Sequence, residues 1–421
     1  MSRIDELIAE HCPDGIGFKA FGEIANIVRG ASPRPIQSFL TDADDGVPWI
    51  KIGDVASSGK YITETAERVT EAGAAKSRRV YPGDFVLSNS MSFGRPYISK
   101  IEGCIHDGWL AISGFNDSFI PDFLFHLLRS APIQSEFARR AGAGTVQNLN
   151  ADIVKSVVIA VPPIAVQREI VKVLDTFTKL EAELEAELEA RRRQYQYYRD
   201  ALLTFGERTD STSKQASKQA SKQARITTLG EIGSFMRGTG IQKSDFIETG
   251  VGCIHYGQIH THYGTWADET LSFISPEFAA RLRKAHTGDL VIATTSEDDE
   301  AVAKAVAWLG DEDVAVSTDA YIFRHTLNPK YVSYFFQTEF FQSQKKPHIT
   351  GTKVRRISGA SLAKVRIPVP SDEEQERIVA ILDRFDALVN DISIGLPAEI
   401  KARRQQYEHY RDRLLTFREA A

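Results

Sequence analysis

The sequence predicts an α+β protein in which two mixed strand-and-helix domains alternate with two long helices that pair as an antiparallel coiled coil. Three observations support this architecture. The chain repeats itself at long range, each repeat ends in a long amphipathic helical pattern, and a polar low-complexity segment lies between the repeats. An internal duplication of this kind predicts pseudo-two-fold symmetry, because each copy supplies one domain and one helix.

The duplication is visible in four pairs of segments. In the first three pairs the two segments lie 208 residues apart. In the fourth pair they lie 212 residues apart, so the second copy is four residues longer. The pairs are FGEIANIVRG at 21–30 with LGEIGSFMRG at 229–238, FLFHLLRS at 123–130 with YVSYFFQT at 331–338, QREIVKVLDTF at 167–177 with QERIVAILDRF at 375–385, and YQYYRDALLTF at 195–205 with YEHYRDRLLTF at 407–417.

Each copy has a mixed part followed by a helical part. The mixed part is rich in short apolar runs and turn signals such as YPGDFVLS and HTGDLVIA, which is typical of strands with short helices. In the helical part, apolar side chains recur at spacings of three, four or seven residues, as on one stripe of a helix. In the first copy the stripe consists of Ile170, Leu174, Phe177, Leu180, Leu184, Leu188, Tyr195, Tyr198, Leu202 and Phe205.

The first helix, residues 167–205, would be about 58 Å long at about 1.5 Å per residue. A globular domain needs far less, so we expect a spacer that packs against the second helix, residues 374–417. The alternative is a pair of ordinary amphipathic helices, each packed on its own domain. Pro397 lies inside the second helix and predicts a kink or break there.

These signals divide the chain into five regions. The segment between the copies, STSKQASKQASKQA, is typical of a flexible linker, and a frayed helical extension is the alternative because Ala, Lys and Gln favour helices. The regions are a first mixed domain at 1–165, a spacer helix at 166–206, a linker at 207–224, a second mixed domain at 225–370 and a C-terminal helix at 371–421.

Composition narrows the function classes. A chain of 421 residues, 42% of them hydrophobic, is long enough for two or more domains. It has neither an apolar run of the roughly 20 residues that span a bilayer nor a signal peptide. Its three scattered cysteines predict neither a disulfide framework nor a zinc cluster. We therefore expect a cytoplasmic protein. The net charge of −5 does not by itself indicate a nucleic-acid binder.

Motifs of self-contained catalysis are missing. GDVASSGKY, from Gly53, has five residues between its glycines where a phosphate loop has four, and Tyr61 replaces the magnesium-binding hydroxyl. There is no Asn/Asp-Pro-Pro-aromatic tetrapeptide, no glycine-rich cofactor turn and no zinc-spaced set. His260 and His262 lack a third ligand, and the acidic SEDDE at 296–300 is more typical of a solvated loop. We expect no catalytic residue, metal or cofactor in this chain.

The duplicated helical motifs resemble those of one family, the specificity (S) subunits of type I restriction–modification systems. The resemblance covers essentially the whole chain and rests on VPPIAVQREIVKVLDTF, IPVPSDEEQERIVAILDRF, ARRRQYQYYRDALLTF and LPAEIKARRQQYEHYRDRLLTF. The stuttered LEAELEAELEA at 180–190 is similar to the tetrad spacer repeats of one subgroup of that family.

The resemblance implies a division of labour. Each mixed domain would be a target-recognition domain that reads one half of a bipartite, asymmetric sequence in double-stranded DNA. The antiparallel coiled coil would set the gap between the half-sites and dock two methylation (M) subunits, which methylate adenine with S-adenosylmethionine. Restriction (R) subunits would use ATP and magnesium to translocate and cleave DNA. This chain would recognise the DNA sequence and would contribute no catalytic residue.

The four-residue repeats suggest that the length of the helix sets the gap between the half-sites. One tetrad of helix adds about 6 Å, a little under two base pairs at roughly 3.4 Å each, and rotates the downstream residues by about 40° around the helix axis. Adding or removing a tetrad should change the gap by about one base pair or a little more and leave the half-sites unchanged.

Base readout needs polar or forked side chains on loops or helix ends, with cations nearby for phosphates. Three loops in each domain meet this description, with SEDDE as an unfavourable neighbour of phosphates. The DNA-binding candidates are Lys51, Ser88, Asn89, Ser90, Arg95, Thr145, Gln147 and Asn148 in the first domain, and His255, Tyr256, Gln258, Thr294, Thr295, Ser296, Thr352, Lys353, Arg355 and Arg356 in the second.

The helices carry arginines and tyrosines, a mixture that suits a protein interface, and the resemblance assigns this region to the methylation subunits. The partner-binding candidates are Arg192, Tyr195, Tyr198, Arg199, Arg404, Tyr407, Tyr410 and Arg411. The main alternative function is a duplicated coiled-coil scaffold that binds other proteins, which the pI near 6.1 would suit. An enzyme with unfamiliar motifs is a third possibility.

Overall fold

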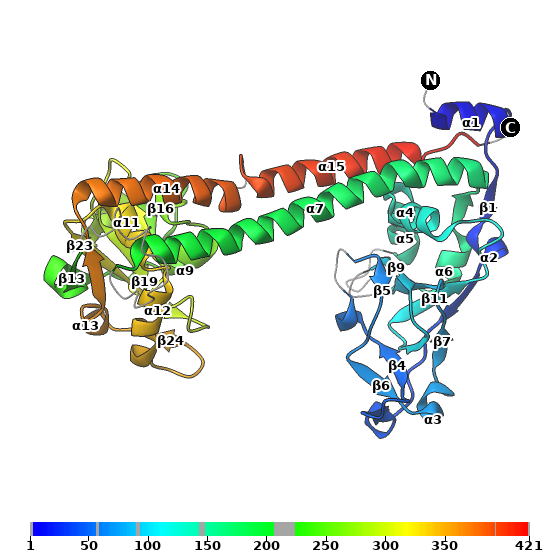
Figure 1. Cartoon of the computed structure of the whole chain (residues 1–421), viewed down its shortest axis with the longest axis horizontal. Coiled ribbons are helices and arrows are strands. Elements are labelled where there is room, and N and C mark those ends of the chain that lie inside the picture. Colours follow the sequence, from blue (N-terminus) through cyan, green and yellow to red (C-terminus); the bar gives the residue numbers. More distant parts are fainter. Residues whose placement is uncertain are drawn as a thin grey trace, which may run out of the picture. The chain divides into compact units, whose positions relative to one another are not determined.

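The computed structural model describes residues 3–55, 59–89, 93–142, 148–205, 224–391 and 393–419. The chain divides into two compact units (Figure 1), one made of residues 1–185 with 400–421 and the other of residues 186–399. Each unit therefore combines one mixed domain with the helical end of the other copy. Of the expected linker at 207–224, only the last residue lies among those described.

The first unit contains two five-stranded sheets. The strand orders are β2–β11–β8–β9–β5 in the inner sheet and β3–β6–β4–β10–β7 in the outer sheet. Phe85 and Leu87 pack in the helix-side core, whereas Val86 packs in the core shared with the outer sheet. Because both faces of β8 are covered, its sequence is a continuous apolar run. The strands are β2 Asn26–Arg29, β3 Leu40–Thr41, β4 Val47–Ile50, β5 Tyr61–Ile62, β6 Glu67–Val69, β7 Arg78–Val80, β8 Phe85–Ser88, β9 Pro96–Ser99, β10 Gly103–Ile105 and β11 Trp109–Ser113.

The second unit repeats this arrangement. Its inner sheet has the order β14–β23–β19–β21–β16, and its outer sheet of four strands has the order β17–β15–β22–β18. Leu290 and Ile292 again face the helix-side core while Val291 faces the outer sheet. The predicted duplication is therefore visible in the strand orders. The strands are β14 Gly233–Arg237, β15 Val251–Ile254, β16 Trp266–Ala267, β17 Ser272–Ile274, β18 Lys284–Ala285, β19 Leu290–Ala293, β21 Ala305–Trp308, β22 Val314–Val316 and β23 Ala320–His325.

Short helices cover the inner sheets. Prolines begin α4 (Pro121–Arg129) and α11 (Pro329–Phe335), where the missing N–H costs no hydrogen bond. The other short α-helices are α1 Arg3–His11, α2 Phe21–Ile24, α3 Glu71–Ala74, α5 Ala131–Ala141, α6 Ala151–Ser156, α8 Leu229–Ile232, α9 Tyr256–Thr261, α10 Pro276–Ala279, α12 Glu339–Lys345 and α13 Gly359–Leu362. Three two-stranded sheets pair β1 Phe18–Ala20 with β12 Val158–Ala160, β13 Arg225–Thr228 with β25 Arg366–Val369, and β20 Thr295–Ser296 with β24 Arg355–Arg356.

The predicted spacer is one continuous helix, α7 (Ile164–Leu203), of 40 residues. In the first unit it pairs with α15 (Leu396–Leu414), and in the second with α14 (Asp372–Asn390). Phe177 stacks on Tyr410, and one helical turn further along α7 Glu181 pairs with Arg404. The pairing of α7 with α15 is therefore antiparallel, as predicted (Figure 1).

The helical ends are exchanged between the copies. Tyr407 and Leu415 of the second copy lie in the core of the first unit, and Tyr195 and Leu203 of the first copy lie in the core of the second. The alternative in which each helix packs only on its own domain is therefore wrong. The long-range identity of the YRD segments is explained by this exchange, since each must fit a domain of the same fold.

The predicted break near Pro397 is confirmed. The structure ends α14 at Asn390 and begins α15 at Leu396, which places Pro397 in the first helical turn. The Asp391 carboxylate accepts hydrogen bonds from the backbone N–H groups of Ser393 and Ile394, at 2.7 and 3.2 Å, and stabilises the turn. Within the described ranges, every helix is too short or too polar to cross a membrane.

Candidate nucleic-acid interface

An exposed arginine holds a turn at one edge of the first unit. Arg29 ends β2, and its Nε donates to the carbonyl of Asp107, in the turn between β10 and β11, at 3.0 Å. A Cβ on the next residue, Gly30, would lie 2.1 Å from the carbonyl oxygen of His106, so this close approach requires glycine. Burial and, as a smaller cause, the charge of Lys51, which follows β4, lower the pKa of His106.

The second unit has the same arrangement at the same repeat spacing. Arg237 ends β14, and its Nε donates to the carbonyl of Thr318, in the turn between β22 and β23, at 2.9 Å. A Cβ on Gly238 would lie 2.1 Å from the carbonyl oxygen of Ser317. His255 follows β15, as Lys51 follows β4.

We name these two sites the arginine corners. The first corner consists of Arg29, Lys51 and residues 106–108, and the second consists of Arg237, His255, Tyr256 and residues 317–319. The backbone frame is shared, but the side chains after the strand and in the turn differ. The sequence signal for these corners is the repeated Arg-Gly of IVRG and FMRG, which sequence reasoning attributed only to the duplication.

A hollow of about 420 Å³ adjoins the second corner. The Tyr256 N–H donates to the Ser317 hydroxyl at 2.9 Å, which fixes the start of α9 against the turn. Burial lowers the pKa of His255, so its imidazole is neutral at pH 7. The hollow is lined by Gly240, Ile241, Gln242, Lys243, His255, Tyr256, Ser317, Thr318 and Asp319.

Carboxylates at the corners are held in place. The Ser32 hydroxyl donates to Asp107 at 2.6 Å, and this hydrogen bond lowers the pKa of the Asp107 carboxyl. In the second corner, the Arg237 guanidinium lies 3.5 Å from the Asp319 carboxylate, with 55% of the arginine side chain exposed. Burial lowers the pKa of His106, which leaves that imidazole neutral as well.

Two candidates at the end of β8, Ser88 and Asn89, form hydrogen bonds within the fold. Ser88 is fully buried and its hydroxyl accepts from the Arg95 N–H at 3.0 Å. The Asn89 amide donates to the carbonyl of Asp107 at 2.8 Å. The carbonyl of Asn89 accepts from the Leu149 N–H at 2.8 Å, which joins this loop to the loop that contains Asn148.

The structure therefore brings these two loops and the first corner together through buried groups. Arg95 and Asn148 are exposed, and Lys51 forms an ion pair with Glu67 at 2.5 Å. Ser90, Thr145 and Gln147 lie outside the described residues.

In the second unit the candidates after β19 and in the later loop are brought together by a strand pair. Thr295 pairs with Arg356 and Ser296 with Arg355 in the two-stranded sheet of β20 and β24. Thr294 and Thr295 are buried, whereas Thr352, Lys353 and Arg356 are exposed. Both polar atoms of the Gln258 amide form hydrogen bonds within the domain. The oxygen accepts from the His255 N–H at 3.0 Å, and the nitrogen donates to the Ser272 hydroxyl at 2.6 Å.

The acidic SEDDE segment is tied to its own domain. Asp299 pairs with Arg355 at 2.9 Å, and the buried Lys345 ammonium donates to the carbonyls of Glu300 and Val302 at 2.9 Å each. These contacts offset part of the negative charge that made this loop a poor neighbour for phosphates. Among the described residues, no group of three or more His, Cys, Asp and Glu side chains is arranged to hold a metal ion.

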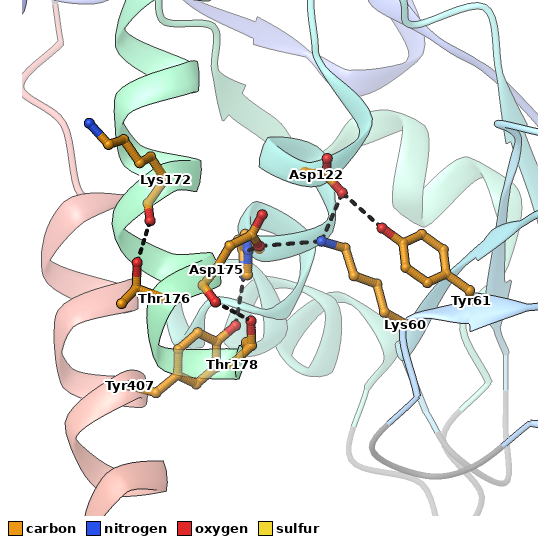
Figure 2. A network of polar contacts seen from close by, with 9 residues as sticks. Lys60, Tyr61, Asp122, Lys172, Asp175, Thr176, Thr178 and Tyr407 are labelled. Carbon is orange, nitrogen blue, oxygen red and sulfur yellow. Dashed lines mark hydrogen bonds and ion pairs between the residues drawn. The ribbon is translucent and has the colours of Figure 1, made fainter. Parts of the chain in front are cut away.

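The aspartate of the LDTF segment anchors α7 to the first domain (Figure 2). Asp175 accepts from His126 Nε2 at 3.0 Å, and His126 Nδ1 accepts from the Tyr407 hydroxyl at 2.8 Å. Burial lowers the pKa of His126, and the hydrogen bond from His126 lowers the pKa of Asp175, which fits a neutral imidazole donating to a carboxylate. Figure 2 shows Lys60 between Asp175 and Asp122, at 3.4 and 2.7 Å.

The second unit builds the same junction from other residues. Asp383, the counterpart of Asp175, accepts from the Tyr334 hydroxyl at 2.7 Å and from Lys330 at 2.8 Å. Tyr195, the counterpart of Tyr407, donates to Asp386 at 3.3 Å. The aspartate is repeated because it joins a helix to the mixed domain in both units, and the tyrosine is repeated because it packs in the core of each unit.

The YRD aspartate connects the exchanged ends in the same way. Asp412 accepts from the N–H of Ala131, the first residue of α5, at 3.0 Å, and Asp200 accepts from the N–H of Glu339, the first residue of α12, at 3.2 Å. The duplicated helical motifs are thus explained by contacts within each unit.

These internal contacts bear on the partner-binding candidates. Tyr195, Tyr407 and Arg411 are buried within the chain, and the guanidiniums of Arg199 and Arg411 lie over the rings of Tyr195 and Tyr407. Arg404 pairs with Glu181 and Glu185. Tyr198 and Tyr410 remain 40% and 42% exposed, and Arg192 and Arg404 are exposed as well, so these four candidates keep accessible surface. Their contact with a partner stays a prediction.

Comparisons with known proteins agree with these motifs. The type I restriction enzyme EcoR124I/EcoR124II specificity subunit of Escherichia coli is 33% identical over 261 residues, which is 60% of this chain and 60% of that protein. A putative type I restriction enzyme specificity subunit of Haemophilus influenzae is 28% identical over 426 residues, 96% of each chain. A solved chain from a study of complex assembly and conformational transition of the type I R-M system has a TM-score of 0.64 at 18% identity, covering 95% of this chain and 97% of that one, and shows the shared fold.

The two copies match one family separately. The family described as type I restriction modification DNA specificity domain matches residues 13–190 and again residues 225–402, so both mixed domains and most of both helical parts are included. The chain belongs to this type I restriction–modification specificity family.

Proposed function

We propose that this chain is the DNA sequence-specificity subunit of a type I restriction–modification complex, in which each mixed domain reads one half of a bipartite target in double-stranded DNA. The observation that carries the proposal is the pair of arginine corners. Both keep the same arginine and the same contact to a turn carbonyl, at 3.0 and 2.9 Å, but present different side chains around it. Two similar backbone arrangements that carry different side chains suit a target whose two halves have different sequences.

The helices would hold the partners. Tyr198 stacks on Phe385 and Tyr410 on Phe177, with ring centroids 5.5 and 5.3 Å apart, and both tyrosines keep part of their surface exposed to solvent. Tyrosine and arginine are enriched in protein interfaces. Two such surfaces suit two methylation subunits, which would methylate adenine with S-adenosylmethionine. Restriction subunits would bring ATP and magnesium, and this chain would bring no catalytic group.

The tetrads within α7 would set the gap between the half-sites. The repeat LEAELEAELEA lies in the continuous part of α7. Removing residues 181–184 would put Glu185 and Glu189 in the places of Glu181 and Glu185, so the ion pairs with Arg404 would be kept. The expected change is about 6 Å of helix, or about one base pair of gap or a little more, with both half-sites unchanged.

The test is to co-express this chain with the methylation subunit of its own system and to map N6-methyladenine in the host genome. A bipartite motif that is methylated only when this chain is present would support the proposal. Methylation that is the same with and without the chain, in a complex shown to assemble, would contradict it. The scaffold alternative predicts that second result, and none of the contacts described above favours it.

A further inference from the structure

The two arginine corners share one residue and differ in others, which distinguishes residues suited to holding a DNA phosphate from residues suited to recognising a base. Arg29 and Arg237 occupy equivalent positions and are both exposed. The Nε of each donates a hydrogen bond to the carbonyl of a residue in the neighbouring turn. An arginine that read a base would favour guanine, and it would then impose the same base on both half-sites. A shared arginine at two sites with different sequences is better suited to a phosphate, which is the same at every nucleotide.

The residues beside the shared arginine supply different chemistry. In the first corner Lys51 is a cation paired with Glu67 at 2.5 Å. In the second corner His255 and Tyr256 line the hollow together with Lys243, and the ring centroids of His255 and Tyr256 lie 4.6 Å apart. The position after the strand is therefore an imidazole followed by a phenol in the second corner and an ammonium group in the first, whose own imidazole, His106, lies in the turn.

The hydrogen bonds of His255 define what it can recognise. Its Nδ1 accepts from the Gly257 N–H at 3.2 Å, so in a neutral ring the proton sits on Nε2. Nε2 is then the donor of a ring that lines the hollow. In the major groove, the complementary acceptors are the N7 and O6 atoms of purines and the O4 atom of thymine.

We propose that His255 and Tyr256 determine the base preference of the second domain, with His255 Nε2 donating to an acceptor on a base edge, while Arg237 and Arg29 each hold a backbone phosphate. The inference rests on the proposed function and adds the residues that distinguish one half-site from the other. The charges fit this occupant, because Arg237, Lys243 and Arg283 carry three cations around this edge and the Arg283 guanidinium donates to the carbonyl of Arg237 at 2.7 Å. The one carboxylate among the residues that line the hollow, Asp319, lies beside Arg237.

The test uses the full chain in complex with its methylation subunit, with His255→Ala, Tyr256→Ala and Arg237→Ala compared with Arg366→Ala. Arg366 is an exposed arginine on β25, so this control removes one positive charge from the same domain. Methylation maps and binding to a duplex that carries the mapped wild-type motif are measured for each variant, after assembly has been checked by gel filtration.

The expected result for His255→Ala is a second half-site that becomes degenerate at one position, with discrimination against the wrong base reduced about five- to a hundredfold. The first half-site and the gap should not change. Tyr256→Ala should relax the same half-site. Arg237→Ala should keep the motif, bind all sequences more weakly, and lower the slope of log affinity against log salt by about 1. Arg366→Ala should behave as wild type.

Three results would overturn the inference. The first is an unchanged second half-site in both the His255 and Tyr256 variants. The second is a changed base preference in Arg237→Ala, because the arginine would then be a base reader. The third is an assembled His255→Ala complex that methylates nothing, because loss of one base contact relaxes a half-site without abolishing methylation. The proposed function itself fails separately, if wild-type methylation does not depend on this chain.

Discussion

Replacing Gln167 by leucine tests whether the repeated helical motif is architectural. Gln167 is fully buried and forms three hydrogen bonds. Its Oε1 accepts from the Ile120 N–H at 3.0 Å, and its Nε2 donates to the carbonyls of Ser118 and Pro162 at 2.7 Å each. These contacts fasten the start of α7 to the start of α4.

The Gln167→Leu variant keeps similar volume, so the main cost is polar. Three lost hydrogen bonds at about 0.5–1.5 kcal/mol each, with the Ile120 N–H left without its acceptor, predict a loss of about 2–4 kcal/mol in the free energy of unfolding of the first unit. Gln375→Leu should have a similar effect in the second unit, because Gln375 accepts from the Asn328 N–H at 2.9 Å and donates to the Pro370 carbonyl at 3.0 Å.

Hydrogen exchange combined with urea unfolding distinguishes the two units in one sample. Gln167→Leu should reduce protection in α4 and the first turns of α7, whereas Gln375→Leu should do so in α11 and α14. Gln196→Leu, at an exposed position of α7, is the matched control and should change neither. Wild-type protection in Gln167→Leu would refute the assignment, and so would equal losses in both units from a single substitution.

Individual contacts support three more predictions. Asp412→Ala should speed exchange in α5, and Asp200→Ala in α12, each at a cost of about 1 kcal/mol from loss of a helix-start acceptor; equal exchange in variant and wild type would contradict this. Burial lowers the pKa of His325 from 6.5 to about 4. The unfolded chain therefore takes up this proton first, and stability of the second unit should fall as pH drops from about 6.5 to about 4. His325→Gln should flatten that dependence in urea titrations at several pH values. Burial raises the pKa of the Cys253 thiol to about 12, so alkylation at pH 8 followed by mass spectrometry should find Cys253 protected while the partly exposed Cys12 reacts.

Much of the fold could be predicted because the chain contains two copies of the same unit, which can be compared with each other. The 208-residue spacing predicted a second domain of the same fold, and the strand orders of the two units agree. The length of α7 was predictable from the apolar stripe, and Pro397 indicated the break before α15. Periodicity could not reveal the exchange of helical ends, because a stripe shows that a helix is covered and does not show which domain covers it.

The candidate site was predicted less well, for a physical reason. Ser88, Asn89 and Gln258 were predicted to lie in exposed loops, but polar side chains at or just after the end of a buried strand often bond nearby groups of their own domain. The structure shows all three in hydrogen bonds within the fold. His255 and Tyr256 were predicted to share one loop and now line a hollow, whereas their DNA contact stays a prediction. Arg29 and Arg237, whose phosphate contacts are proposed above, were not among the candidates because their repetition was attributed to the duplication alone.

The most direct test of the specificity role compares methylation maps for the wild-type chain and for the chain lacking residues 181–184, each with the same methylation subunit. We predict one bipartite motif in both, with the same bases in each half-site and a gap that differs by about one base pair or a little more. A motif that is independent of the chain would contradict the specificity role, and an unchanged gap would contradict the role of α7 in setting the spacing.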